Sequence, residues 1–292
     1  MKRLAWFIAA CCLTAGAVGP AFARAVVEFA SLDVAEGQAV VLKAYWYPVP
    51  APRAAAVVLL HGCGGMYDRK GLVSERMHDY AALLNQQGFH ALLVDSLTPR
   101  GEKEICTQRV GTRQVTQANR RLDALAALQW LAQQPEVDAQ RLGLMGWSNG
   151  GSTVLSATNT RHKEVAALAV KPAFAVAFYP GCEAELKRSY VPAAPLLLLV
   201  GESDDWTPAA PCHELAARAV GTLPEIEGYA GAFHAFDSAA PVRLRNDVPN
   251  GANPGQGVHV GGNAEAWQRS RERLLRFLQA YRNSPALPQN TR

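Results

Sequence analysis

The sequence has no large excess of charge of either sign, and after its first two dozen residues it has no long uncharged apolar run. Its 29 Lys and Arg against 25 Asp and Glu give a net charge of +4, which is too balanced for an electrostatic nucleic-acid binder. Without a run of about eighteen apolar residues, no internal membrane span is expected. Low-complexity tracts and repeats are also missing. The 49% of hydrophobic residues can bury a core, which excludes intrinsic disorder.

The first 23 residues have the pattern of a secretory signal peptide. Lys2 and Arg3 precede an uncharged apolar stretch, and Ala21-Phe22-Ala23 places small residues at the two positions that a signal peptidase inspects. We therefore expect cleavage before Arg24 and export to the periplasm or the medium. Two alternatives stay open, which are an uncleaved anchor and a lipoprotein signal at Cys11.

Strands and helices alternate along the rest of the chain. Five continuous apolar runs are typical of strands buried on both faces, and they cover 56–60, 91–94, 142–145, 173–178 and 196–200. A hairpin at 26–34 and 40–47 precedes them, and a last strand at 225–229 follows. Helical periodicity covers 74–88, 115–131, the segment after Ser148, 208–220 and 267–278. The pattern predicts one α/β domain over 24–292, with a mostly parallel central sheet, an N-terminal antiparallel hairpin and helices on both faces. Residues 243–262 are expected to form an ordered surface loop.

Four cysteines lie beyond the signal peptide, and none of them forms a C-x-x-C motif. A zinc ribbon or thioredoxin-type motif is therefore not expected. Cys63, Cys106, Cys182 and Cys212 predict two disulfides in an exported chain. Three pairings are formally open, and free buried thiols are a further alternative. We favour Cys182 with Cys212 and Cys63 with Cys106, because Cys182 and Cys212 both follow neighbouring strand ends at one edge of the sheet.

Ser148 has the setting of an activated nucleophile. It lies in Gly146-Trp147-Ser148-Asn149-Gly150-Gly151, a G-x-S-x-G between a predicted strand and a small-residue helix. The glycines permit a sharp turn that raises the hydroxyl above the sheet. The alternative is a structural glycine turn with an incidental serine.

A second glycine-rich turn, His61-Gly62-Cys63-Gly64-Gly65, follows the first buried strand. In hydrolases whose nucleophilic serine lies at a sharp strand-to-helix turn, the glycine-rich turn after this earlier strand supplies one of the two N–H groups that stabilise the oxyanion. We expect the backbone N–H groups of Cys63 and Asn149 to form that oxyanion hole. His61 precedes the serine and is expected to be structural.

A nucleophilic serine needs a base, and four histidines follow Ser148. His234 comes directly after the last predicted strand, at the carboxyl edge where catalytic groups lie in open α/β folds, so we assign it as the base. His162 lies in a polar patch and is expected to be solvated. His213 lies in a predicted helix, and His259 lies in the loop near the C-terminus.

Three acids compete for the role of orienting His234, all in the loop after the strand at 196–200. We assign Asp204, three residues beyond the glycine that ends this strand. Asp205 is the rival, with the capping of a helix that begins at Pro208 as its other role. Glu202 is expected to be a solvated loop residue.

Five motifs, in order over about residues 35–282, resemble those of the dienelactone hydrolase family of α/β-hydrolases. They are His61-Gly62-Cys63-Gly64-Gly65, Asp95-Ser96 with Pro99-Arg100-Gly101, Gly146-Trp147-Ser148-Asn149-Gly150-Gly151, Gly201 with Asp204-Asp205-Trp206-Thr207-Pro208, and Gly231-Ala232-Phe233-His234-Ala235-Phe236. The resemblance implies an α/β-hydrolase fold, a Ser or Cys nucleophile with Asp and His, and hydrolysis of esters or lactones. Dienelactone hydrolases proper carry a cysteine nucleophile and a glutamate in the first strand-end turn, where this chain has Ser148 and Gly62.

The resemblance also implies candidates for substrate binding. Arg100 falls near the place where the family uses an arginine for a substrate carboxylate, and the alternative is a salt-bridged loop residue. Trp206 and Tyr67 are further candidates for substrate contacts. The sequence thus predicts an exported serine hydrolase of small carboxylic esters or lactones that acts through an acyl-enzyme, with no metal or organic cofactor. A peptidase or polyester hydrolase on the same fold and a non-catalytic binding protein are the alternatives.

Overall fold

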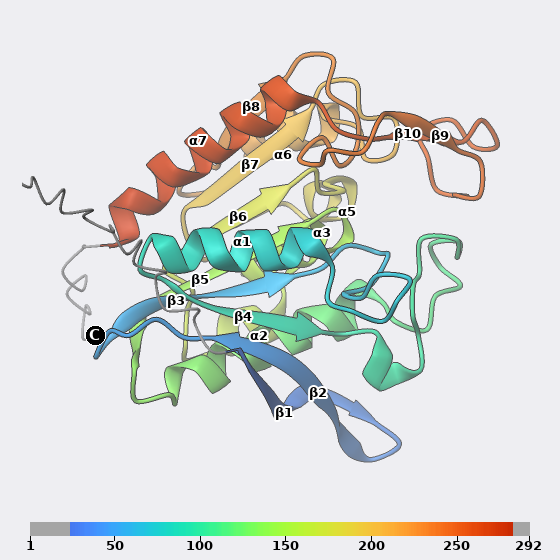
Figure 1. Ribbon diagram of the computed structural model, residues 1–292. Helices are drawn as coiled ribbons and strands as arrows, with labels where there is room; N and C mark the ends of the chain where they lie inside the picture. Colours follow the sequence, from blue (N-terminus) through green and yellow to red (C-terminus); the bar gives the residue numbers. More distant parts are fainter. Residues whose placement is uncertain (1–23, 283–292) are drawn as a thin grey trace, which may run out of the picture.

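The computed structural model describes residues 24–282, in which an eight-stranded sheet runs through the molecule (Figure 1). The strands, in the order β1-β2-β4-β3-β5-β6-β7-β8, are β1 (Ala25–Ala35), β2 (Gln38–Tyr47), β4 (His90–Asp95), β3 (Ala54–Leu60), β5 (Val137–Trp147), β6 (Phe174–Phe178), β7 (Leu196–Gly201) and β8 (Glu225–Tyr229). β1 and β2 form an antiparallel hairpin, β2 pairs antiparallel with β4, and the remaining neighbours are parallel. The predicted sheet and its N-terminal hairpin are confirmed. The predicted signal peptide and Cys11 lie outside the described residues.

Helices cover both faces of the sheet. The longer ones are α1 (Glu75–Gln86), α2 (Gln117–Ala132), α3 (Asn149–Thr158), α6 (Ala210–Arg218) and α7 (Ala264–Arg282), and the short ones are η1 (Thr98–Arg100), α4 (Lys163–Ala167) and α5 (Glu183–Lys187). One apolar cluster joins a sheet face to α1 and α7, which lie in front in Figure 1, and a second joins the other face to α2, α3 and α6. Because both faces are covered, all seven residues of β3 are buried, as its unbroken apolar run predicts. Among the helices of residues 24–282, none has the length and apolarity needed to cross a membrane.

The parallel strands bring four functional loops to one edge of the sheet. β3, β5, β7 and β8 all run in the same direction, so their carboxyl ends meet at the edge on the right of Figure 1. The loops that leave this edge contain the residues selected from the sequence. Parallel pairing therefore assembles a site from segments that are far apart in the chain.

The segment expected to be a loop over residues 243–262 contains secondary structure. β9 (Arg243–Arg245) and β10 (Val258–Val260) pair as a small antiparallel hairpin, which extends beyond the sheet edge in Figure 1. Val260 also forms a parallel bridge with His234. The strands are only three residues long, too short to leave a period-2 pattern in the sequence. The hairpin thereby supports the loop that carries His234.

Both predicted disulfides are present, and the alternative of free thiols is excluded for these four residues. Cys63 bonds to Cys106, with a Cα–Cα distance of 4.9 Å, and Cys182 bonds to Cys212, with a Cα–Cα distance of 5.1 Å. The second bridge joins the start of α5 to the first turn of α6. Two disulfides are typical of a protein that works in an oxidising compartment.

Candidate active site

Ser148 occupies a strained turn between β5 and α3. Its φ is 54° and its ψ is −119°, a conformation that a non-glycine residue adopts only when its surroundings impose it. The surroundings leave no space for side chains, because a Cβ on Gly146 would collide with the Gly150 carbonyl, and a Cβ on Gly150 would collide with the Leu60 carbonyl. The two glycines of the motif are therefore required by close backbone contact. The alternative of a structural glycine turn with an incidental serine does not account for a serine, instead of a third glycine, in this conformation.

Ser148, His234 and Asp204 form one continuous hydrogen-bonded chain. The Ser148 hydroxyl donates to His234 Nε2 at 2.8 Å, and His234 Nδ1 donates to Asp204 Oδ2 at 2.8 Å. The three residues are 9%, 2% and 5% exposed, respectively. This order and these distances suit transfer of the serine proton to the imidazole, with the carboxylate fixing the tautomer.

The loop after β7 holds Asp204 and the ring of His234 in place. Asp204 Oδ1 accepts the N–H groups of Trp206 and Thr207 at 2.8 and 2.9 Å. The Thr207 hydroxyl lies 3.0 Å from both Asp204 Oδ2 and His234 Nδ1. The His234 ring lies against Tyr179 and Trp206, whose ring centroids are 4.8 and 4.6 Å away. Thr207 and Tyr179 are not predicted from the sequence, although the D-x-x-T spacing is a signal of such a side-chain turn.

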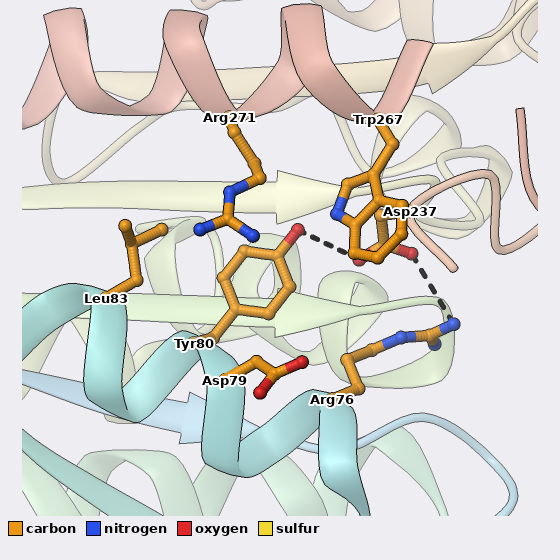
Figure 2. A pocket seen from close by; sticks show the side chains of 7 residues that line it. All are labelled: Arg76, Asp79, Tyr80, Leu83, Asp237, Trp267 and Arg271. Atoms are coloured by element: carbon orange, nitrogen blue, oxygen red, sulfur yellow. Dashed lines mark hydrogen bonds and ion pairs between the residues drawn. The ribbon is translucent and has the colours of Figure 1, made fainter. Parts of the chain in front are cut away.

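A buried network also anchors the loop that carries His234. Asp237, which is 2% exposed, accepts the hydroxyl of Tyr80 at 3.0 Å, and Arg76 lies 3.5 Å away (Figure 2). Asp237 also accepts the hydroxyl of Tyr179 at 2.6 Å. Burial raises the pKa of both phenols, so they stay protonated donors. Because Tyr179 also packs on the His234 ring, this network links the ring to α1.

Asp205, the rival acid, binds His259 instead of His234. Its two oxygens accept the backbone N–H and the ring Nδ1 of His259 at 2.8 and 2.7 Å. The expected capping role is wrong as well, because α6 begins at Ala210 and has no side-chain cap. The side chain reaches β10 instead of the helix. His259 therefore supports the β9–β10 hairpin.

The other candidates also form pairs of their own. Glu202 and His213 make an exposed pair at 2.8 Å, as expected of solvated side chains. The expectation for His162 is wrong, because it is only 8% exposed and its Nε2 lies 2.9 Å from Glu185. Its partner lies on α5, 23 residues further along the chain, so the polar sequence around His162 does not reveal the burial.

The first strand-end turn lies against the Ser148 turn. A Cβ on Gly62 would come within 3.5 Å of the Ser148 Cβ. In the part of the chain that the structure describes, neither the Cys63 N–H nor the Asn149 N–H donates to a backbone carbonyl. Preorganised N–H groups of this kind stabilise the negative charge that develops on a carbonyl oxygen. The Gly62 turn thus lies against Ser148, and the oxyanion hole at Cys63 and Asn149 stays a prediction.

His61 has the structural role expected for it. Its Nδ1 donates to the Gly62 carbonyl at 2.7 Å, and its Nε2 accepts the Ser96 N–H at 3.3 Å. Burial, followed by the nearby charge of Arg120, lowers the pKa of His61 to about 3. The imidazole is therefore neutral at physiological pH, and it fixes the turn instead of exchanging protons.

The Cys63–Cys106 bridge ties the turn that contains the Cys63 N–H. Ile105 also donates its N–H to the Cys63 carbonyl at 2.8 Å. We expect the double variant Cys63→Ser/Cys106→Ser to lower kcat by about 10-fold with a smaller change in KM. The reason is that a displaced Cys63 N–H would stabilise the transition state less well. Steady-state ester kinetics measure this effect.

The second disulfide provides the matched control. Cys182→Ser/Cys212→Ser removes a bridge of similar Cα separation and is expected to lower the free energy of unfolding by about 2–4 kcal/mol. Its kcat should stay closer to wild type. Equal losses of kcat in the two double variants would contradict a specific role for the Cys63 turn.

A cleft of about 470 Å³ adjoins the Ser148 turn. Its lining includes Gly62, Gly64, Tyr67 and Trp147, together with residues of α1 and α7. Figure 2 shows a smaller pocket between Arg76 and Tyr80 of α1 and Trp267 of α7, which shares Arg76 and Trp267 with the cleft. Tyr67 lines this cleft and stays a predicted substrate contact, whereas Trp206 lies against the His234 ring.

Arg100 has no donor left for a substrate carboxylate. Its Nε and Nη2 donate to Asp33, both Nη atoms donate to Asp123, and Nη1 also donates to the Ser96 carbonyl. All five N–H groups are accounted for. The expected substrate role is therefore not supported, and Arg100 is the salt-bridged loop residue of the alternative.

Residues 42–282 match the dienelactone hydrolase family. The chain belongs to the dienelactone hydrolase family. The match confirms the resemblance seen in the motifs. The protein is a carboxylic ester hydrolase, a class that includes lactone hydrolases because a lactone is a cyclic ester. A Bradyrhizobium sp. protein named "probable 2-oxo-3-(5-oxofuran-2-ylidene)propanoate lactonase" is 28% identical over 204 residues, which cover 65% of this chain and 76% of that protein.

Solved structures show the same fold. Thermogutta terrifontis esterase 2, phosphorylated by paraoxon, is 18% identical with a TM-score of 0.62, covering 89% of this chain and 96% of its own. The dienelactone hydrolase-like promiscuous phosphotriesterase P91 from metagenomic libraries is 20% identical with a TM-score of 0.59. The match covers 89% of this chain and 100% of the phosphotriesterase chain. The predicted α/β-hydrolase fold is thereby confirmed.

Proposed function

We propose that the protein is a serine hydrolase that cleaves carboxylic esters or lactones through an acyl-enzyme on Ser148. His234 acts as the base and Asp204 as the acid that orients it. The observation that carries this proposal is the hydrogen-bonded chain from Asp204 through His234 to Ser148, at a strained glycine-flanked turn. Membership of the family supports the ester or lactone as the bond that is cleaved.

The proposed reaction has two halves. Ser148 Oγ attacks the carbonyl carbon while its proton passes to His234 Nε2, and the N–H groups of Cys63 and Asn149 stabilise the oxyanion. The C–O bond then breaks, and His234 returns the proton to the departing alcohol. With a lactone, this alcohol stays attached to the acyl group. A water molecule, deprotonated by His234, releases the acid and restores Ser148.

A panel of substrates tests the proposal. It contains acyl esters of graded chain length, lactones, amides and a polyester, each assayed with wild type and with Ser148→Ala. We expect turnover of esters or lactones that depends on Ser148. Faster turnover of the amides or the polyester would favour the peptidase or polyesterase alternative. No turnover, together with no labelling by a fluorophosphonate, would favour a non-catalytic binding protein.

We also propose that residues 1–23 form a cleaved signal peptide, followed by a single exported domain. The charged, apolar and small-residue segments support this, as do the two disulfides. We expect the protein from the periplasm or the medium to begin at Arg24, which N-terminal sequencing measures. A start at Met1 or a lipid-modified Cys11 would contradict the cleavage site.

A further inference from the structure

Arg120 is a fully buried cation on α2, with 0% exposure. Its Nη2 donates to the His61 carbonyl at 2.7 Å, and its Nη1 donates to the side-chain oxygen of Asn149. Both acceptors are neutral. The nearest candidates for an ion pair are already used, because Asp123 pairs with Arg100 and Asp95 accepts from the residues that follow it. Within residues 24–282, Arg120 therefore has no ion pair of its own.

The buried guanidinium nevertheless keeps its charge. Burial lowers the pKa of Arg120 to about 10, with Asp123 and Asp95 opposing the shift, so the group is cationic at neutral pH. His61, beside it, is neutral. A buried charge with only neutral hydrogen-bond partners is costly to fold. Its retention calls for a role that a neutral side chain of the same size would not fill.

The two acceptors belong to the two turns that hold the proposed oxyanion donors. The His61 carbonyl lies in the peptide unit directly before the one that supplies the Cys63 N–H. The other acceptor is the side chain of Asn149, whose own N–H is the second donor. The turns also touch at this point, since a Cβ on Gly150 would lie 2.5 Å from the His61 oxygen. One guanidinium thus joins both turns on the side of α2.

We propose that Arg120 is the positioning residue of the oxyanion hole. Its planar fork holds the two turns, and with them the Cys63 and Asn149 N–H groups, at a fixed separation. Its charge lies behind these donors, where it favours the anionic tetrahedral intermediate over the neutral substrate. The inference rests on the proposed serine hydrolase mechanism and adds a residue that does not touch the substrate.

Arg120→Met tests the proposal with kinetics and with a transition-state analogue, a trifluoromethyl ketone that adds to Ser148. We expect kcat to fall by about 100-fold, with KM within about 3-fold of wild type. The inhibition constant of the ketone should rise by a factor similar to the fall in kcat/KM. Arg120→Lys should recover part of the loss, because an ammonium keeps the charge but does not span both acceptors.

Arg121→Met is the matched control, because this neighbour is also buried, at 8% exposure, but contacts Ser156 and Glu164. We expect it to lose stability and to keep kcat and ketone inhibition within about 3-fold of wild type. If Arg120→Met changes kcat and the inhibition constant of the ketone no more than Arg121→Met does, Arg120 is only structural and the proposal is overturned.

Two further measurements keep the test decisive. If Arg120→Met does not fold, Asn149→Ala removes one acceptor and keeps the backbone N–H, and we expect kcat to fall by about 10-fold with KM little changed; unchanged kcat would overturn the proposal. Failure of the proposed function has a different signature, since wild type itself would then neither hydrolyse esters nor react with a fluorophosphonate.

Discussion

Ser148→Ala is expected to lower kcat/KM for ester hydrolysis by about 1,000-fold or more, while the protein stays folded. The substitution removes the oxygen that attacks the carbonyl and leaves the oxyanion donors and the cleft intact. Residual activity should come from these groups alone. Steady-state kinetics measure the loss, and thermal unfolding followed by circular dichroism checks the fold.

Ser156→Ala is the matched control for this substitution. Ser156 lies two turns further along α3, is 1% exposed, and accepts a hydrogen bond from Arg121. We expect it to alter stability by about 1 kcal/mol and to leave turnover near wild type. Undiminished turnover in Ser148→Ala would show that another group is the nucleophile.

Asp204→Asn is expected to lower kcat by about 1,000- to 10,000-fold. The carboxylate accepts the proton of His234 Nδ1, which leaves Nε2 free to accept the proton of Ser148. An amide in the same place can donate to Nδ1, which moves the ring proton to Nε2 and blocks the transfer. The protein should stay folded, because the side chain keeps its size. The measurement is kcat for an activated ester.

The neighbouring Asp205→Asn substitution provides the comparison. Asp205 binds the backbone and ring of His259 and is part of the β9–β10 support. We expect a loss of stability, because the partly buried contacts with His259 are weakened. We expect kcat to stay within about 5-fold of wild type, because the carboxylate binds His259 and not His234. If Asp205→Asn is the variant that loses activity, the two neighbouring acids have been assigned the wrong way round.

The sequence predicts the strands and the loops of the site because both depend on local patterns. Unbroken apolar runs mark the central strands, and parallel strands place their carboxyl ends at one edge. Ser148, Asp204 and His234 lie at or shortly after the carboxyl ends of three parallel strands, β5, β7 and β8. Their proximity can therefore be predicted from the order of the elements, before any distance is known. The disulfide between Cys182 and Cys212 follows from the same argument.

Contacts between distant segments leave no such pattern. The buried His162 contacts Glu185 on another helix, and Arg100 donates to Asp33, which is 67 residues away. Arg120 lies on a helix whose polar residues resemble an exposed face, yet it is buried between two turns. Such residues are placed by the packing of whole elements against each other, which periodicity does not encode.

Trapping the acyl-enzyme tests the central claim most directly. The protein is mixed with an activated ester, quenched in acid within the first turnovers and digested with trypsin. The tryptic peptide that contains Ser148 spans residues 142–161 and also includes Ser152 and Ser156, so fragment-ion sequencing is needed. We expect the mass of the acyl group on Ser148 in wild type and no acylated peptide in Ser148→Ala. An acyl group on another residue, or ester turnover in Ser148→Ala at the wild-type rate, would contradict the account.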